Sequence, residues 1–253
     1  MTDGMLYLVG TPIGNLDDMT YRAIATLKTV DLIAAEDTRH TGKLLKHFQI
    51  TTPQISYHDH NRQQRAGQLI SKMLAGETIA LVSDAGMPGI SDPGFELVAE
   101  AIAEKINVVP IPGVSAVITG LVASGLSPEK FAFLGFLPTK KKIRLEQLED
   151  LQSETKTLVF YEAPHRLLKT LQEFQEIFGG DRQIVCAREL TKLHEEFWRG
   201  SIEQAIVYYA SHQPKGEFTV IVAGQQKAIR AEISDEEIVL RLKKQLASTA
   251  LVK

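Results

Sequence analysis

Short apolar segments alternate with amphipathic segments along this 253-residue chain, and the alternation restricts its possible folds more than any other feature. Buried parallel strands are short and rich in Val, Ile and Leu, whereas the helices between them carry apolar residues on one face. In the first half, the pattern predicts strands at 5–9, 31–35, 79–82 and 107–111, and helices at 19–27, 64–74, 95–104 and 115–123. We therefore expect an α/β domain with a parallel sheet.

The second half keeps the alternation but changes the order of its elements. Its predicted strands lie at 131–136, 157–161, 183–187, 195–199 and 218–222, and its predicted helices at 141–151, 164–178 and 201–210. Because no helix separates the strands at 183–187 and 195–199, we expect a mixed sheet in a second α/β domain.

A break in the pattern at Pro112 and Gly113 separates the two halves. Near the end of the chain, Ser234 and Glu237 match a capping box that opens a helix with one apolar face, and this face needs a packing partner. We predict an N-terminal α/β domain at 1–113, a C-terminal α/β domain at 114–226, a cleft between them, and the start of a small helical region at 227–253.

Composition limits the class of protein. The formal net charge of −3 does not indicate a protein that binds nucleic acid with its whole surface, although the run 140–144 is locally basic. No apolar run is long enough to span a bilayer, and the first residues lack the pattern of a signal peptide. The single cysteine, Cys186, excludes a disulfide within the chain. We expect a cytoplasmic protein without membrane contact.

The segment Ser83–Gly94, Ser-Asp-Ala-Gly-Met-Pro-Gly-Ile-Ser-Asp-Pro-Gly, follows the strand predicted at 79–82. Its glycines let peptide groups approach a bound molecule closely, and its prolines stiffen the chain between them. We expect Asp92 to cap the next helix, with Pro93 in the first turn. The segment would then join the carboxyl end of a strand to the amino end of a helix, where α/β proteins bind ligands.

Three further Gly/Pro-rich turns lie at one end of a predicted strand, at 10–15, 111–116 and 215–219. A single turn of this kind is weak evidence, because tight turns use the same residues for geometry alone, but four together favour one shared cleft. The turn at 10–15 matches neither the dinucleotide fingerprint G-x-G-x-x-G nor a phosphate-binding loop with its lysine. A nucleoside-containing ligand remains compatible with the pattern.

Charged residues also follow the predicted strands, at 35–40, 161–166 and 186–192. A carboxylate in such a cluster can accept a proton and an arginine can bind phosphate, whereas a solvated loop or an ion pair is the structural alternative. The sequence His58-Asp59-His60 does not indicate a metal site, because neighbouring side chains of an extended segment point to opposite faces. We expect no bound metal.

The motifs, taken in order, resemble those of the tetrapyrrole (corrin/porphyrin) methylase superfamily. Within it, they are most similar to the branch that methylates the ribose 2′-oxygen of a cytidine in small-subunit (16S) ribosomal RNA. The resemblance covers residues 5 to about 224. It is carried by Tyr7–Leu16, Ala35–Arg39, Ser83–Gly94, Pro112–Ala116, Gly135–Pro138, Tyr161–Arg166 and Gly216–Thr219. Corrin and sirohaem methylases share the fold but typically lack the second and third of these motifs together.

The resemblance implies a homodimer of two-domain α/β subunits that bind S-adenosylmethionine in the cleft and act on the RNA of the small ribosomal subunit. The residues it assigns to the cofactor are Pro12, Ser83, Asp84, Ala85, Gly86, Ile90, Ser115, Ala116, Tyr161, Glu162, Ala163, Glu217, Phe218 and Thr219. For the catalytic base, the candidates are Glu36, Asp37 and Glu189. For RNA phosphates, they are Arg39, Lys140, Lys141, Lys142, Arg144, Arg166 and Arg188.

Two other functions remain open at this point. A tetrapyrrole (precorrin or porphyrin) C-methyltransferase would act on carbon of a small substrate, and a sensor of S-adenosylmethionine would bind the cofactor without turnover. Methyl transfer from labelled cofactor to small ribosomal subunits distinguishes both from the RNA enzyme.

Overall fold

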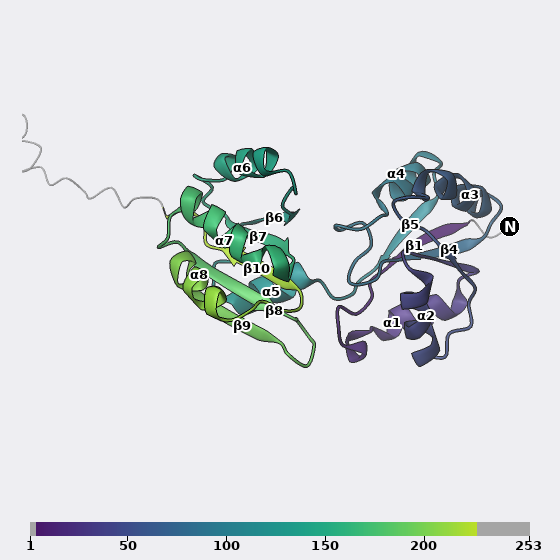
Figure 1. Ribbon diagram of the computed structural model, residues 1–253. Coiled ribbons are helices and arrows are strands. Elements are labelled where there is room, and N and C mark those ends of the chain that lie inside the picture. Colours follow the sequence, from purple (N-terminus) through teal and green to yellow (C-terminus); the bar gives the residue numbers. More distant parts are fainter. Residues whose placement is uncertain (1–3, 227–253) are drawn as a thin grey trace, which may run out of the picture.

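The computed structural model describes residues 4–226, which form two α/β units, each with one five-stranded sheet (Figure 1). The strands of the first unit are β1 (Met5–Val9), β2 (Leu32–Ala35), β3 (Gln54–Ser56), β4 (Thr78–Val82) and β5 (Asn107–Ile111). Its helices are the short 3-10 helix η1 (Leu16–Asp18), α1 (Tyr21–Thr29), α2 (Thr38–His47), α3 (Arg62–Leu74) and α4 (Phe95–Ala103). The strand order is β3-β2-β4-β1-β5 and all neighbours are parallel, which confirms the predicted sheet.

Helices cover both faces of the first sheet. Apolar residues of α1 and α2, among them Leu27 and Leu44, pack on one face, and those of α3 and α4, among them Leu69 and Leu97, pack on the other. Figure 1 shows the two helix pairs on opposite sides of the strands. Since both faces are covered, the strands are apolar throughout: all four residues of β2 are buried.

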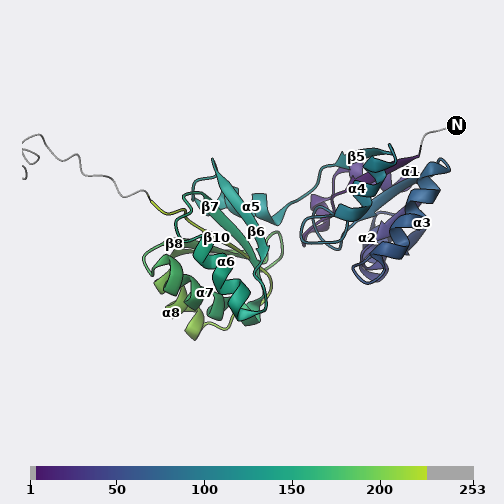
Figure 2. The ribbon, with the colours of Figure 1, turned by 90° about the horizontal axis from the view of Figure 1, so that it is seen from above.

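The second unit contains a mixed sheet, as predicted. Its elements are α5 (Ala116–Ser124), β6 (Phe131–Phe136), α6 (Lys141–Asp150), β7 (Thr157–Glu162), α7 (Pro164–Phe178), β8 (Gln183–Arg188), β9 (Glu196–Ser201), α8 (Ile202–Ser211) and β10 (Phe218–Val222). The strand order is β6-β7-β10-β8-β9, in which only β6 and β7 are parallel. Figure 2 shows α5 on one face of this sheet and α6, α7 and α8 on the other.

Three elements of the first unit were not predicted: the short 3-10 helix η1, helix α2 and strand β3. The segment 35–40 was interpreted as a charged loop, but Asp37 caps α2, which begins at Thr38. Most residues of this helix are polar, and its only large apolar side chains are the buried Leu44 and Leu45, so the sequence gives no clear helical pattern. Strand β3 has only three residues and therefore gives almost no pattern. The limits proposed for the three regions stay predictions, and 227–253 lies outside the described residues.

Candidate functional site

The topology of the first sheet creates a crevice at the carboxyl ends of β1 and β4. These strands are neighbours, yet the helix that follows β1 and the helix that follows β4 lie on opposite faces of the sheet. The two connections therefore diverge, and open α/β sheets bind ligands at such a point.

Three turns meet at this crevice through their backbones. After β1, the amide of Thr11 donates to the carbonyl oxygen of Gly86 over 2.9 Å, and the amide of Gly86 donates to Thr11 over 3.1 Å. The turn after β5 comes equally close, since a Cβ added to Gly10 would lie 2.7 Å from the Cα of Gly113. Glycine is required at this contact because no side chain fits between the two backbones. The three turns consequently form one cluster, and the shape of the cluster depends on all three.

The loop Ser83–Gly94 bends through backbone angles that favour glycine. Gly86 and Gly89 have φ of 79° and 85°, and Ser91 adopts φ 63° without being a glycine. Asp92 does not cap α4, so that prediction is wrong: the cap residue is Gly94, which has no side chain to bond to the helix amides. Asp92 instead lines a pocket.

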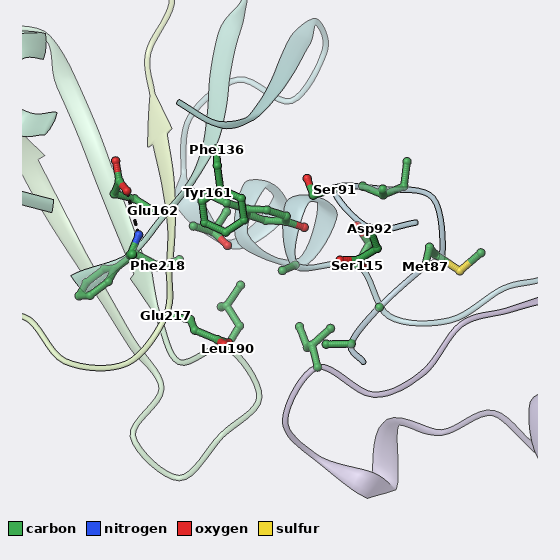
Figure 3. Close-up of a pocket in the computed structure, with 18 of the residues that line it drawn as sticks. Met87, Ser91, Asp92, Ser115, Phe136, Tyr161, Glu162, Leu190, Glu217 and Phe218 are labelled. Atoms are coloured by element: carbon green, nitrogen blue, oxygen red, sulfur yellow. Dashed lines mark hydrogen bonds between the residues drawn. The ribbon is translucent and has the colours of Figure 1, made fainter. Parts of the chain in front are cut away.

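The pocket lies between the loop 83–94 and the edge of the second sheet, and its volume is about 380 Å³ (Figure 3). Most of the residues predicted to touch a cofactor line it: Ala85, Gly86, Ile90, Ser115, Ala116, Tyr161, Glu162, Ala163, Glu217, Phe218 and Thr219. Pro12, Ser83 and Asp84 do not line it, although Ser83 supports the adjacent turn by accepting a hydrogen bond from Thr11 at its carbonyl oxygen.

Several pocket residues were missed in the sequence. They are Ile13, Met87, Ser91, Asp92, Phe136, Pro164, Ala187 and Leu190. Most belong to the quoted motifs, so the motifs marked the right segments without showing which side chains face inward.

Aromatic side chains form the wall of the pocket on the second sheet. The ring of Tyr161 contacts those of Phe133 and Phe136, with ring centres 4.9 and 5.5 Å apart. Burial, together with the nearby Asp92, raises the pKa of Tyr161 to about 12, so its hydroxyl stays protonated and can donate a hydrogen bond.

Glu162 holds the turn that starts α7. Its carboxylate accepts hydrogen bonds from the amide of Ala163 and the hydroxyl of Thr170, and it lies 3.5 Å from Arg166. Arg166 also donates to the carbonyl oxygen of Leu137 over 2.8 Å. The guanidinium predicted to bind RNA is thus already engaged within the second unit.

On the same wall, next to Phe218, Lys192 bridges two carboxylates. Its ammonium lies 2.8 Å from Glu189 and 3.0 Å from Glu217, and its side chain packs against Gly14 of the first unit. Burial acts to raise the pKa of Glu189, but hydrogen bonds from Lys192 and the amide of Glu217 outweigh it, and the pKa is lowered. Glu189 is therefore a poor proton acceptor.

The other two base candidates lie at the carboxyl end of β2. The hydrogen bonds and charge of Arg39 hold the pKa of Asp37 well below its usual range, so Asp37 is also a weak base. Burial raises the pKa of Glu36, whose carboxylate accepts from the amide of Asp84 over 3.2 Å.

The residues predicted to bind RNA differ in their access to solvent. The side chains of Arg39 and Lys142 are 88% and 87% exposed, and Lys140 and Lys141 are exposed at the start of α6. Arg188 is partly engaged, because it donates to the carbonyl oxygen of Lys215 and pairs with Glu196.

The prediction that Arg144 binds RNA is corrected by the structure, which buries this residue. Only 3% of it is exposed, and its guanidinium is bonded to Glu173 and to the carbonyl oxygens of Pro138 and Thr139. Its buried guanidinium is not accessible to an RNA phosphate and instead fixes α6 to α7.

Residues 4–226 contain no group of three or more His, Cys, Asp or Glu side chains placed to hold a metal ion. None of the described helices is both long enough and apolar enough to cross a membrane. Cys186 is buried, and burial raises its pKa to about 12, which leaves the thiol unreactive.

Comparison with proteins of known sequence gives strong matches. The family model for tetrapyrrole (corrin/porphyrin) methylases matches residues 5–206. The protein named ribosomal RNA small subunit methyltransferase I from Synechocystis sp. is 58% identical over 93% of this chain and 84% of its own length. The protein of the same name from Bacillus subtilis is 50% identical over 92% of this chain and 79% of its own length.

Solved structures are similar at lower identity. The uroporphyrin-III-C-methyltransferase from Thermus thermophilus has a TM-score of 0.63 at 18% identity, covering 87% of this chain and 94% of its own. The putative diphthine synthase from Entamoeba histolytica has a TM-score of 0.64 at 14% identity, covering 88% of this chain and 94% of its own. At these identities the likeness establishes the fold alone. The matched family model and the identity to the Synechocystis and Bacillus proteins show that this chain belongs to the tetrapyrrole (corrin/porphyrin) methylases.

Proposed function

We propose that this protein transfers a methyl group from S-adenosylmethionine to the ribose 2′-oxygen of a cytidine in 16S ribosomal RNA. The observation that carries this function is the identity of 50–58%, over at least 90% of the chain, to proteins named ribosomal RNA small subunit methyltransferase I. The alternative, methylation of a tetrapyrrole carbon, is supported only by neighbours that share the fold at 18% identity or less.

The pocket fits the cofactor by size and chemistry. Its volume of about 380 Å³ lies in the range of small-molecule sites, roughly 300–1,000 Å³. Apolar side chains such as Ile13, Ile90 and Leu190 suit an adenine ring, and the hydroxyls of Ser115 and Thr219 suit polar groups of the ribose or amino acid. Carboxylates and aromatic faces on the wall favour a positively charged sulfur.

When bound, S-adenosylmethionine supplies an electrophilic methyl group on sulfur. The part of the protein is to bring the acceptor hydroxyl in line with that methyl group and to exclude water, which is worth an effective molarity on the order of 10⁵ M or more. The fixed turns around Thr11, Gly86 and Gly113 provide a rigid surface for this alignment. A base that accepts the hydroxyl proton completes the site.

RNA phosphates are proposed to bind to exposed cations near the mouth of the pocket. Arg39 lies in the first turn of α2, at the same edge of the sheet as the crevice, and Lys140–Lys142 follow shortly after Phe136 of the pocket wall. Arg166 and Arg188 are secondary candidates because their side chains are only 22% and 25% exposed, whereas that of Arg39 reaches solvent despite its pairing with Asp37. The substrate would be the RNA of the small ribosomal subunit, in the cytoplasm.

We expect Arg39→Ala to reduce methylation of small-subunit RNA about three- to tenfold, because one phosphate contact is lost, while the Kd for S-adenosylmethionine stays within about twofold. Steady-state methyl transfer and calorimetric titration measure the two quantities. Lys28→Ala is the matched control, because Lys28 lies in the last turn of α1, at the opposite end of the sheet. This variant should leave both the methylation rate and the Kd for S-adenosylmethionine unchanged. Equal loss of cofactor affinity in Arg39→Ala would contradict the role in RNA binding.

The function is tested directly with small ribosomal subunits isolated from cells that lack the modification. Incubation with labelled S-adenosylmethionine, followed by mapping of ribose methylation, is expected to give one 2′-O-methylcytidine in 16S RNA. Transfer to a porphyrinoid instead of RNA supports the alternative, and binding of the cofactor without any transfer indicates a sensor.

We also propose a homodimer, in line with the resemblance described above. The exposed apolar side chains Ile118 and Val122 of α5 support it, because paired apolar groups on one helix surface are suited to an interface. Sedimentation equilibrium of the full chain, compared with an Ile118→Lys variant, tests the proposal: dissociation of the variant alone supports an interface at α5.

A further inference from the structure

Three carboxylates line the pocket, and only one of them has no basic side chain paired with it among the described residues. Glu162 accepts hydrogen bonds from Ala163 and Thr170 and lies 3.5 Å from Arg166, and Glu217 is paired with Lys192. Asp92 lies on the opposite wall, and none of the salt bridges among residues 4–226 includes it (Figure 3). On the proposed function, which it presupposes, we infer that Asp92 is the general base that accepts the proton of the acceptor hydroxyl.

The backbone holds the Asp92 side chain at the pocket. Because Asp92 precedes Pro93, the backbone of Asp92 is restricted to extended conformations. The residue before it, Ser91, adopts the left-handed φ of 63°. Gly94 then packs closely against Gly89, since a Cβ added to Gly94 would lie 3.1 Å from the amide nitrogen of Gly89. These restraints fix the backbone from which the Asp92 side chain extends, and the hydrogen bond from Ser83 holds the carboxylate, as a catalytic group requires.

The surroundings of Asp92 favour its protonated form. Burial is the largest effect, followed by the negative charge of Glu36, with smaller contributions from Asp84 and Asp59, and a hydrogen bond from Ser83 opposes them. Tyr161 faces it from the second sheet. Together these groups raise the pKa of Asp92 to about 7. A base is most effective when its pKa is near the working pH, whereas Asp37 and Glu189 are shifted the other way.

The proposed step is balanced without any further reagent. Ionised Asp92 takes the hydroxyl proton while the ribose oxygen bonds to the methyl carbon. The bond between that carbon and sulfur breaks, and its electron pair remains on sulfur, which becomes a neutral thioether. Asp92 afterwards releases its proton to water.

The test compares wild type with Asp92→Asn on unmodified small ribosomal subunits as a function of pH. For wild type, kcat/KM should rise with pH through about 7, because the base must be ionised. Asp92→Asn should lower kcat about 10²- to 10⁴-fold and abolish this rise, while the Kd for S-adenosylmethionine changes less than about threefold. In the cofactor-free protein, a ¹³C carboxyl signal that is missing in Asp92→Asn should titrate near pH 7.

Two variants separate this role from its alternatives. Glu36→Gln removes a neighbouring negative charge, so turnover should persist and the rise in kcat/KM should move to lower pH. Asp59→Asn is the control outside the pocket, because Asp59 is 70% exposed and pairs with Arg62; its rate should match wild type at high pH.

Asp92→Asn that retains both the rate and the pH profile overturns the inference, and so does Glu36→Gln that loses turnover and the pH-dependent rise. If the wild-type protein transfers no methyl group to the RNA, the proposed function itself is wrong. Failure of the proposed function is thus distinguishable from failure of Asp92 as the base, in which the wild-type protein still methylates the RNA.

Discussion

Arg144→Ala is expected to lower the free energy of unfolding by about 3–5 kcal/mol, because it leaves a carboxylate buried without its partner. The side chains of Arg144 and Glu173 are only 4% and 7% exposed, and they share two hydrogen bonds of 2.6 and 2.7 Å. The guanidinium also satisfies the carbonyl oxygens of Pro138 and Thr139, which would otherwise lose their donor. Chemical denaturation measures the loss.

Two further variants identify the cause. Lys142→Ala removes a cation from the same helix, but its side chain is 87% exposed, so its effect should stay within about 0.5 kcal/mol. The double variant with Met at both 144 and 173 removes both charges and keeps most of the volume, and it should recover a large part of the stability. If Arg144→Ala is as stable as Lys142→Ala, the buried pair contributes nothing to the fold.

Gly10→Ala is expected to weaken binding of S-adenosylmethionine at least about tenfold and to destabilise the protein by about 1–3 kcal/mol. The added Cβ would lie 2.7 Å from the Cα of Gly113 and 2.8 Å from its amide nitrogen. Backbone atoms cannot move aside as a flexible side chain can, so the turns after β1 and β5 must separate. The hydrogen bonds between Thr11 and Gly86 connect the loop 83–94 to the turn after β1. Displacement of that turn should therefore also displace the pocket wall that this loop forms.

The matched control is Gly67→Ala in α3, where no atom lies within 4 Å of the added Cβ. Alanine favours a helix over glycine, so this variant should keep cofactor affinity and gain about 0.5–1 kcal/mol of stability. Calorimetric titration and thermal unfolding measure both effects. Unchanged affinity in Gly10→Ala would show that the close contact of the turns does not shape the cofactor site.

The sequence predicted most elements because their signals are local. The apolar run of β4 and the helix after Ser201 depend only on nearby residues, and both lie where they were expected; the structure adds that Ser201 and Gln204 form a capping box at α8. Helix α2 was missed because polar residues dominate its surface, and the cap of α4 was assigned to Asp92 because Asp-Pro is a common helix start. Local rules could not show that the loop turns Asp92 into the pocket.

The same limit applies to the candidate site: local motifs predict its segments but not the surroundings of each side chain. The motifs identified most of the segments that line the pocket, since the spacing of Gly and Pro is visible in the chain itself. They could not separate Arg39 from Arg144, although one is exposed and the other is almost fully buried. That difference depends on Glu173, which approaches Arg144 from another helix.

The sequence by itself determined the two sheets, the turns that end their strands, and the family to which those turns belong. Only the tertiary structure decided which charged groups are free to act: it paired Asp37 with Arg39 and Glu189 with Lys192, whereas Asp92 has no cation paired with it within residues 4–226. The physical reason is that strand and turn formation depends on backbone angles and side-chain periodicity along the chain. The ionisation of a carboxylate depends instead on burial and on charges that distant segments bring to it.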